Sequence, residues 1–395
     1  MRFAIILALA CQPYFAVSFL YGAVPVVLRQ NGASLETIGL FGLVFFAFTI
    51  NFLWAPAIDR FSPGGYGRRR FWLIVTQVLS IVLLATLALL DPAAQSTEIL
   101  IAGMLLAALA ATQRSAILGY CAEALSDDEK AWGATAFGWG TALGNIVGGS
   151  FGLLMIERVG WSAALLVLAG IMVLITVPLL RIAEPAPAPL SRRAALTVAT
   201  DGQTWLVIAA LTPATFGLAI AFAMTQPRLI DLGFSLTSIG IVAAIGNLVA
   251  ATLAGPATGW LATRFQLRHV IAGGAVAIAG TFTALIAFDR FSGDWLGAVT
   301  AVIVVFSAIC ALGVASNTLF LGVAGQRGAA ATDVTFFSAI MSLVALAGFM
   351  SSGFIASAAG YGATLGIAAA GAMSTGIAAA LLWPRMFASN PDASQ

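Results

Sequence analysis

One arginine, Arg114, lies in a stretch where almost every neighbour is apolar or small. The chain reads AATQRSAILGYCAEA from Ala110 to Ala124. An ionisable residue within an apolar helix marks a functional site by default, because burying its charge costs free energy. A guanidinium presents its N–H donors in a planar fork, which suits a carboxylate or a phosphate. Arg114 therefore predicts an anion-binding site; the alternatives are a side chain that reaches the membrane interface and a structural contact with a helix carbonyl.

The composition predicts a membrane protein built from helices. Of the 395 residues 61% are hydrophobic and only 9% are charged, and the mean hydropathy is +1.01. Soluble domains carry about 25% charged residues. Apolar runs of roughly 20 residues, long enough to cross a bilayer as helices, recur along the whole chain. The expected fold class is an all-α membrane protein in which the lipid bilayer is the solvent.

Glycine, proline and charged residues divide the chain into twelve predicted spans. The longest polar break, RIAEPAPAPLSRRAALTVATDG, follows the sixth span and reads as an extended linker. The expected domains are an N-terminal six-helix bundle (1–180), a cytoplasmic linker (181–203) and a C-terminal six-helix bundle (204–395). The spans are predicted at 4–28, 35–57, 71–90, 98–122, 131–156, 161–180, 204–229, 235–261, 269–288, 295–323, 332–356 and 362–384.

The two halves of the chain resemble each other in sequence. A shift of 201 positions aligns LRQNGASLETIG with LIDLGFSLTSIG, so that Gly32, Ser34 and Gly39 fall on Gly233, Ser235 and Gly240. Parallel repeats of six helices are an architecture of transporters, with the substrate site near the bilayer midplane. The repeat therefore predicts a transporter with two pseudo-symmetric bundles.

Further polar and aromatic residues fall at about the depth of Arg114 when residues are counted inward from the cytoplasmic ends of the helices. Amides, hydroxyls and aromatic rings around an arginine suit an anionic group carried on an aromatic or amide body. For each neutral residue alone, helix–helix packing is the alternative. The predicted substrate-binding residues are Gln12, Tyr14, Gln113, Arg114, Trp139, Phe216, Asn247 and Asn317.

The acidic residues narrow the substrate class. All sixteen fall at predicted helix ends or in loops. Without a carboxylate at mid-membrane, an anionic or zwitterionic small molecule is the expected substrate, and the coupling ion is left open. The net charge of +2 gives no basic surface for nucleic acid. No Cys/His pair, metal-ligand cluster or phosphate loop is evident, so we expect neither an enzyme nor a cofactor, and the expected assembly is a monomer.

The Lys/Arg distribution predicts the orientation. With both termini in the cytoplasm, thirteen basic residues face the cytoplasm and four face outward. This bias matches the positive-inside rule. Glycines in GWGTALGNIVGGSFG, spaced four apart, put small residues on one face of the fifth helix, which permits close helix contact. The GNIVGG portion is similar to an antiporter signature and favours export, which is an alternative to import.

The stretch FLWAPAIDRFSPGGYGRRRFWLIVTQ resembles the cytoplasmic loop signature of the major facilitator superfamily. The resemblance implies a conformational latch formed by Asp59, Arg60, Arg68 and Arg69, and a cavity lined by helices one, four, seven and ten. An acid at a helix end can pair with a neighbouring helix N-terminus or a base. The alternative is a set of positive-inside anchors with no switching role.

The stretches SLETIGLFGLV, FLWAPAIDRF and GRRRFWLIVTQ further resemble sequences of the peptide/acetyl-coenzyme-A transporter branch of that superfamily. A chain without extra helices is more similar to its pyochelin- and rhizobactin-type siderophore permeases than to its muropeptide permeases. The resemblance implies proton-coupled import of a ferric siderophore or a related small anion across a bacterial inner membrane. Import of muropeptides or peptides and export of drugs or metabolites are the alternatives. Gln113-Arg114-Ser115 departs from that branch, which has acids there, so its proton chemistry does not transfer directly.

Overall fold

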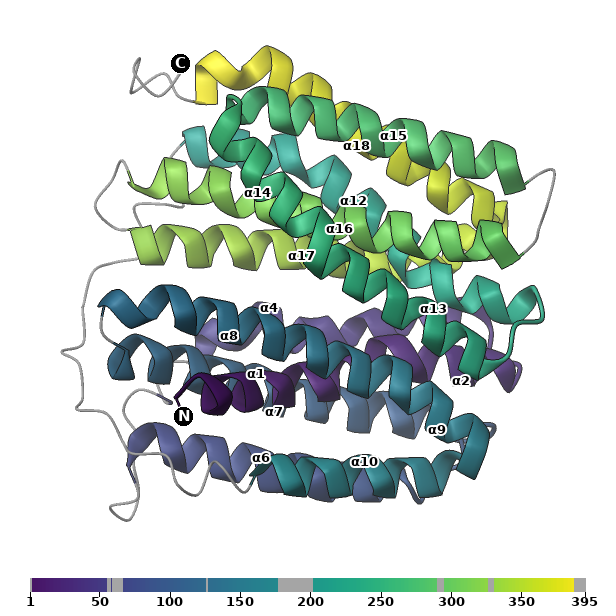
Figure 1. The fold of residues 1–395 in the computed structure, drawn as a ribbon. Coiled ribbons are helices and arrows are strands. Elements are labelled where there is room, and N and C mark those ends of the chain that lie inside the picture. The colour runs from purple at the N-terminus through teal and green to yellow at the C-terminus, as the bar shows by residue number, and fades with distance from the viewer. Residues whose placement is uncertain are drawn as a thin grey trace. The chain divides into compact units, whose positions relative to one another are not determined.

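The computed structural model describes residues 2–54, 58, 67–125, 127–176, 202–289, 295–325 and 330–386. Within these ranges the secondary structure is helical and no strand occurs, which confirms the predicted all-α class (Figure 1). Among the described residues, ten helices are long and apolar enough to cross a membrane, and two shorter apolar helices cover Leu35–Ile50 and Trp161–Thr176. The short ones coincide with the predicted second and sixth spans.

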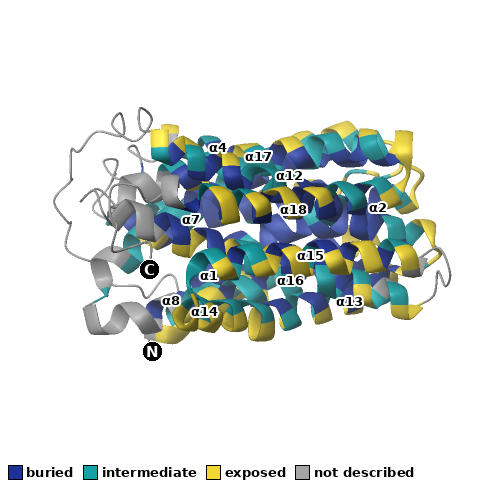
Figure 2. Ribbon diagram, turned by 90° about the horizontal axis from the view of Figure 1, so that it is seen from above, coloured by how far each residue is buried: buried dark blue, intermediate teal, exposed yellow. Residues whose placement is uncertain are grey.

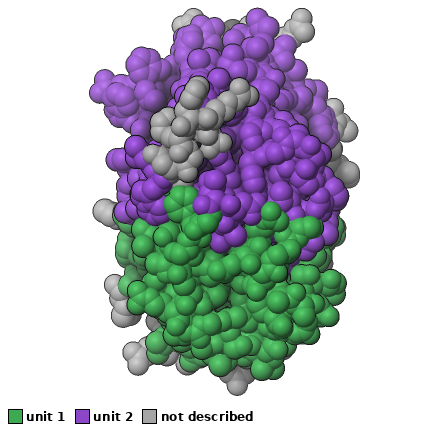
Figure 3. Space-filling model, turned by 90° about the vertical axis from the view of Figure 1, so that its right-hand side faces the viewer, with its two compact units in different colours: residues 1–34, 43–190, 233–244 green, residues 35–42, 191–232, 245–395 purple. Residues whose placement is uncertain are grey.

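The chain forms two compact units, coloured separately in Figure 3. Unit 1 comprises residues 1–34, 43–190 and 233–244, and unit 2 comprises residues 35–42, 191–232 and 245–395. Each unit therefore contains one short segment whose sequence belongs to the other predicted half. Residues 35–42 lie in unit 2 and residues 233–244 lie in unit 1.

Unit 1 is built from the elements of the first six predicted spans, except for residues 35–42 of the second span, so that η2 is divided between the two units. Several spans are not uniform α-helices. The π-helices η1 and η5 and the 3₁₀-helices η2 and η3 interrupt the first, fifth and second spans. The elements are α1 (Arg2–Ser18), η1 (Phe19–Ala23), α2 (Val24–Gln30), η2 (Phe41–Phe45), α4 (Phe46–Ile50), η3 (Asn51–Leu53), α6 (Arg68–Leu87), α7 (Ser96–Ala124), α8 (Asp127–Asn145), η5 (Ile146–Phe151), α9 (Gly152–Val159) and α10 (Trp161–Thr176).

Unit 2 is centred on α12, which contacts α16, α17 and α18. The stacked rings of Phe320 and Phe337, with centroids 4.4 Å apart, join α16 to α17. The elements of unit 2 are α3 (Leu35–Leu40), α12 (Gly202–Asp231), η7 (Ala250–Ala254), α14 (Gly255–Arg264), α15 (Leu267–Asp289), α16 (Trp295–Gly325), α17 (Ala330–Ala359) and α18 (Tyr361–Met386). The helix α13 (Leu236–Val249) is divided between the two units.

Long apolar side chains remain exposed along the helices. Examples are Leu105, Leu174 and Leu381, which are 57%, 71% and 72% exposed. Figure 2 shows exposed residues alternating with buried ones along the long helices. In water such surfaces would associate, whereas lipid tails cover them at no cost. The exposed apolar surface is therefore the lipid-facing surface expected of a membrane protein.

The glycine face of α8 packs directly on α1. A Cβ on Gly144 would overlap the Cys11 carbonyl oxygen and lie 2.9 Å from the Phe15 nitrogen. Gly140 of α8 and Gly148 of the following η5 meet the Leu7 and Phe15 carbonyls in the same way. Absent side chains thus let the two backbones approach, as small-residue faces do in membranes. The predicted role of these glycines in helix contact is confirmed.

The packing predicts different effects for two alanine substitutions in α8. Gly144→Ala should lower thermal stability by about 1–3 kcal/mol, because the methyl group has no room against α1. Gly138→Ala is the matched control, since no atom lies within 4 Å of its Cβ position. It should be neutral or stabilising by up to about 1 kcal/mol. Thermal unfolding in detergent distinguishes the two, and equal behaviour of both variants would contradict this packing.

Candidate substrate-binding site around Arg114

Arg114 lies within α7, ten residues before the helix ends at Ala124, or about 15 Å along the axis. Its side chain is half-buried, and its Nε atom is buried without a hydrogen-bond partner in the described part of the chain. A buried donor without a partner costs about 1–3 kcal/mol, and more when the group is charged. Among the described residues, the Nε atoms of Arg70 and Arg268 are likewise buried without a partner, and a binding role for Arg114 stays a prediction.

The neighbouring Gln113 belongs to a buried amide network. Its Nε2 atom donates to Gln12 Oε1 and to Gln77 Oε1, both at 2.8 Å. The other two amides extend to α10, since Gln12 Nε2 donates to the Ile175 carbonyl and Gln77 Nε2 to the Met172 carbonyl, both at 3.1 Å. All three glutamines are at most 1% exposed. The network joins α1, α6, α7 and α10.

Two of the predicted substrate-binding residues, Gln12 and Gln113, are engaged in this structural network. Gln113 donates to Gln12, and the Gln12 amide in turn donates to the Ile175 carbonyl, so these polar groups find partners within the low-dielectric interior. A substrate would reach these amides only by displacing a partner. The network also sets the rotation of α7 about its axis, because Gln113 faces α1 and α6. Arg114 is the next residue and therefore lies about 100° further around the helix. Substrate binding by the glutamines themselves stays a prediction.

A second polar contact joins α7 to the end of the second span. Asn51 Nδ2 donates to Ser115 Oγ at 2.5 Å and to the Ala111 carbonyl at 3.2 Å. One turn further, Trp54 Nε1 donates to Thr112 Oγ1 at 2.9 Å. The Oδ1 atom of Asn51 is buried and accepts no hydrogen bond from any described residue. The α7 helix thus carries an unsatisfied donor at Arg114 and, through Ser115, holds a side chain with an unsatisfied acceptor.

The remaining predicted binding residues are distributed over both units. In unit 1, the Tyr14 ring meets Phe137 edge to face at 6.0 Å, and Trp139 is 50% exposed. In unit 2, Phe216 and Asn247 are half-buried and Asn317 is exposed. Within unit 1, Tyr14 shares α1 with Gln12. The roles of all eight residues in binding stay predictions.

The predicted latch is only partly within the described chain. Asp59 and Arg60 lie outside the described residues, and Arg68 is described as part of α6 without its side chain. Arg69 is only 6% exposed, and a Cβ on Gly119 would lie 2.6 Å from its Nη2 atom. Gly119 thus lets the Arg69 guanidinium lie directly on α7. A switching role for these residues stays a prediction.

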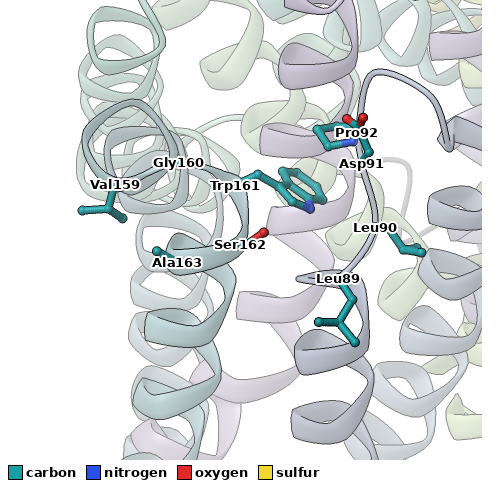
Figure 4. A pocket seen from close by; sticks show the side chains of 9 residues that line it. All are labelled: Leu89, Leu90, Asp91, Pro92, Val159, Gly160, Trp161, Ser162 and Ala163. Atoms are coloured by element: carbon teal, nitrogen blue, oxygen red, sulfur yellow. The ribbon is translucent and has the colours of Figure 1, made fainter.

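A pocket of about 620 Å³ lies in unit 1, away from Arg114. Residues 89–92 after α6 and residues 159–163 at the junction of α9 and α10 line it, with the Trp161 ring turned toward Asp91 and Pro92 (Figure 4). The turn that contains Asp91 leads into α7 at Ser96, and Arg114 lies eighteen residues further along, or about 27 Å. This pocket therefore plays no part in the proposed site.

Gln77 was not among the residues predicted from the sequence, although it links Gln113 to the Met172 carbonyl of α10. The residue stands in FWLIVTQVLSIV, where a single amide in an apolar span was the available signal. It lies on α6, which lies side by side with α10 (Figure 1), so its partners come from helices distant in sequence. Which amides face one another depends on helix rotation, and that rotation is set by packing in three dimensions.

The network predicts that Gln77→Leu lowers stability by about 1–3 kcal/mol, because one Gln113 donor loses its acceptor. Thermal unfolding of the purified chain measures this loss. Val78→Ala is the control, since Val78 is adjacent but 49% exposed on the apolar surface. A Gln77→Leu protein as stable as the unsubstituted chain would contradict the network.

Comparison with known proteins places the chain in a family. The family model of the Major Facilitator Superfamily matches residues 6–332. The anhydromuropeptide permease of Escherichia coli K12 is 27% identical over 276 residues, covering 67% of this chain and 56% of that protein. An uncharacterised Haemophilus influenzae protein is 28% identical over 372 residues, covering 88% of this chain and 86% of that protein.

Solved structures show the same fold. A bacterial homologue of the human lysosomal transporter Spinster, in an inward-facing and unoccupied conformation, superposes with a TM-score of 0.73 at 15% identity, covering 98% of each chain. At this identity the likeness concerns the fold. The chain spans about half the length of the curated anhydromuropeptide permease that it matches. The family match over residues 6–332, together with the apolar spans, nevertheless identifies the chain as a multi-pass membrane protein that belongs to the major facilitator superfamily.

Proposed function

We propose that the chain is a secondary active transporter that moves a small anionic or zwitterionic solute by alternating access between two six-helix halves, residues 1–180 and 204–395, joined by 181–203. The observation that carries the proposal is the buried, unpartnered Nε atom of Arg114. The neighbouring amides are engaged with one another, so the guanidinium is the group that has binding capacity left.

A carboxylate is the ligand that suits this position best. Placed beside Arg114, it accepts charge-assisted hydrogen bonds and offsets the cost of the buried cation. The empty acceptor at Asn51 Oδ1 calls for a donor, which an amide N–H or a hydroxyl on the same solute provides. A solute with both an anionic group and N–H or O–H donors satisfies both atoms.

A muropeptide or peptide fits this chemistry, because it combines free carboxylates with amide N–H groups and, in a muropeptide, sugar hydroxyls. The similarity to an anhydromuropeptide permease over 276 residues supports this class. The siderophore substrate expected from the sequence has no comparable support among the relatives and stays a prediction. We therefore propose import of a muropeptide-like or peptide-like anion.

The bacterial relatives support an inner-membrane location. The thirteen-to-four distribution of basic residues supports cytoplasmic termini. In that orientation the turns at Gly32, Gly160, Gly233 and Gly360 face the outside, and Arg114 lies on the cytoplasmic side of the midplane. Proton coupling, a monomeric state and a cytoplasmic latch complete the proposal.

Uptake of labelled anhydromuropeptide into proteoliposomes tests the proposal. Arg114→Gln should reduce uptake at low substrate concentration by at least about tenfold, because it removes a charge-assisted contact of roughly 1.5–3 kcal/mol. Arg114→Lys keeps the charge without the fork, and should retain part of the uptake. Uptake that is the same in Arg114→Gln and in the unsubstituted chain would rule out the site.

Two further arms separate the components of the proposal. Arg264→Gln is the control, because Arg264 is an exposed arginine at the end of α14 in unit 2. A ferric siderophore offered in place of the muropeptide compares the two substrate classes directly. Collapse of the pH gradient should slow uptake if protons are coupled, and unchanged uptake would assign another driving ion.

A further inference from the structure

Two π-helical segments of unit 1 pack against each other. The segment η1 interrupts the first span and η5 interrupts the fifth, and the two are in contact. A Cβ on Gly149 would lie 2.6 Å from Ser18 Oγ, and a Cβ on Gly22 would lie 3.7 Å from Gly149 Cα, so glycines bring the segments together. Turns of the π-helical kind are rare and occur frequently at functional sites. The side chains at this contact are therefore candidates for a role beyond packing.

Asn145, the last residue of α8, lies at this contact and is held by the first span. Its backbone carbonyl accepts a hydrogen bond from Ser18 Oγ at 2.8 Å, and its Oδ1 atom accepts one from the Tyr21 hydroxyl at 3.1 Å. A side-chain amide carries two N–H donors as well as its oxygen. The Nδ2 atom of Asn145 donates to no residue within the described ranges. The Tyr21 contact therefore holds the amide by its oxygen and leaves its donors unused.

The three-glutamine network shows how a purely structural amide is satisfied in this unit. Gln12, Gln77 and Gln113 each donate from Nε2 to a partner, and all three are at most 1% exposed. Asn145 differs on both counts, because its nitrogen has no partner in the described part of the chain and the residue is only half-buried. Helix–helix contact thus accounts for the oxygen of Asn145 but not for its nitrogen. A donor without a partner inside a membrane protein is costly unless a solute uses it.

Asn145 and Arg114 lie at different depths in the same unit. Gln12 accepts a hydrogen bond from Gln113, so Arg114 lies near the level of Gln12 on α1. Ser18, which donates to the Asn145 carbonyl, lies six residues further along the chain, or about 9 Å along the helix axis. A solute that contacts both side chains is therefore elongated, with its anionic group at one end and a hydrogen-bond acceptor toward the other.

Aromatic rings of the first and second spans lie beside Asn145. The Tyr21 ring, whose hydroxyl holds the amide, lies 5.5 Å from the Phe45 ring. Tyr14 approaches the same part of α8, because its Cβ lies 3.0 Å from the Cβ position of Gly144. Aromatic rings offer apolar surface next to the polar amide. An acceptor that carries a small apolar group, such as the carbonyl of an acetyl group, suits these surroundings.

We propose that Asn145 is a second contact point for the transported solute and that its Nδ2 atom donates to the carbonyl of an acylated amine. Tyr21 is a positioning residue, because its hydroxyl holds the amide oxygen and so directs the nitrogen. The inference rests on the proposed function and narrows its substrate class to an elongated anion that carries an N-acyl group. Arg114 takes the carboxylate, and Asn145 selects for the acyl carbonyl.

Uptake of two related solutes into proteoliposomes tests the proposal. The first is an anhydromuropeptide, which carries N-acetyl groups, and the second is the same compound with those groups removed. Asn145→Leu keeps the approximate size of the side chain but has no donor. It should lower kcat/KM for the acetylated compound about three- to tenfold, the range of one uncharged hydrogen bond, and leave kcat/KM for the deacetylated compound unchanged.

Two further variants test positioning and provide a control. Tyr21→Phe should lower the preference for the acetylated compound in the unsubstituted chain, and should have no further effect on that preference in Asn145→Leu. Thr141→Val is the matched control, because Thr141 lies one turn before Asn145 and its hydroxyl already donates to the Phe137 carbonyl at 2.9 Å. It should leave the uptake of both compounds unchanged.

The outcomes separate this contact from the anion site. Arg114→Gln should lower the uptake of both compounds by the same factor. An Asn145→Leu protein that keeps the preference of the unsubstituted chain, or loses uptake of both compounds equally, overturns the proposal for Asn145 and leaves that for Arg114 standing.

Thiol labelling decides the case in which neither compound is transported, which would contradict the proposed function. Asn145→Cys is made in a chain whose own cysteines are replaced by alanine, and it should react with a water-soluble thiol reagent and be protected by the anhydromuropeptide. A thiol that does not react, or reacts equally with and without the compound, overturns the proposal. The cysteines to be replaced are Cys11, Cys121 and Cys310.

Discussion

The structure of unit 1 depends on how polar side chains are satisfied where hydrocarbon surrounds the helices. Gln12, Gln77 and Gln113 exchange hydrogen bonds with one another and with carbonyls of α10, so the amide cluster is complete in itself. Arg114, the next residue, has a buried Nε without such a partner. In a low-dielectric interior an unpaired polar group is costly, and this difference is the basis for proposing Arg114 as the substrate-binding group. The proposed transport activity follows from it.

Close helix contact is the second constraint, and glycine supplies it. Glycines of α8 meet carbonyls of α1. In the two segments exchanged between the predicted halves, Gly240 meets the Ser150 carbonyl and Gly39 packs against Gly353 of α17. Contacts of this kind have little side-chain interlocking. Segment 233–244 packs on η5 through Gly240, and the Thr237 N–H at the start of α13 donates to Glu157. The amide network, in contrast, ties four helices of one unit together.

Much of this fold follows from sequence alone. Apolar runs predicted all twelve helical segments, and glycine spacing predicted the face of α8 that meets α1, because both depend on local composition. The breaks at η1, η2, η3, η5 and η7 (Ala250–Ala254) were not predicted, since π- and 3₁₀-turns arise where tertiary contacts compete with the α-helical pattern.

The site was predicted in part. Arg114 stood out because one charge in an apolar helix is conspicuous, and Gln113 stood beside it. Gln77 and the cap at Glu157 were missed, because each depends on a partner distant in sequence: Met172 for the amide and Thr237 for the carboxylate. The resemblance to siderophore permeases rested mainly on loop sequences, which reflect ancestry more directly than the chemistry of a binding pocket. The relatives include an anhydromuropeptide permease instead.

A structure determined with an anhydromuropeptide bound is the most direct measurement of the central claim. A carboxylate of the ligand is expected within hydrogen-bonding distance of Arg114 Nε, with an N–H or O–H group near Asn51 Oδ1 and the three-glutamine network intact. A ligand bound elsewhere, with Arg114 turned to the lipid interface or paired with an acid of the protein, would contradict the account.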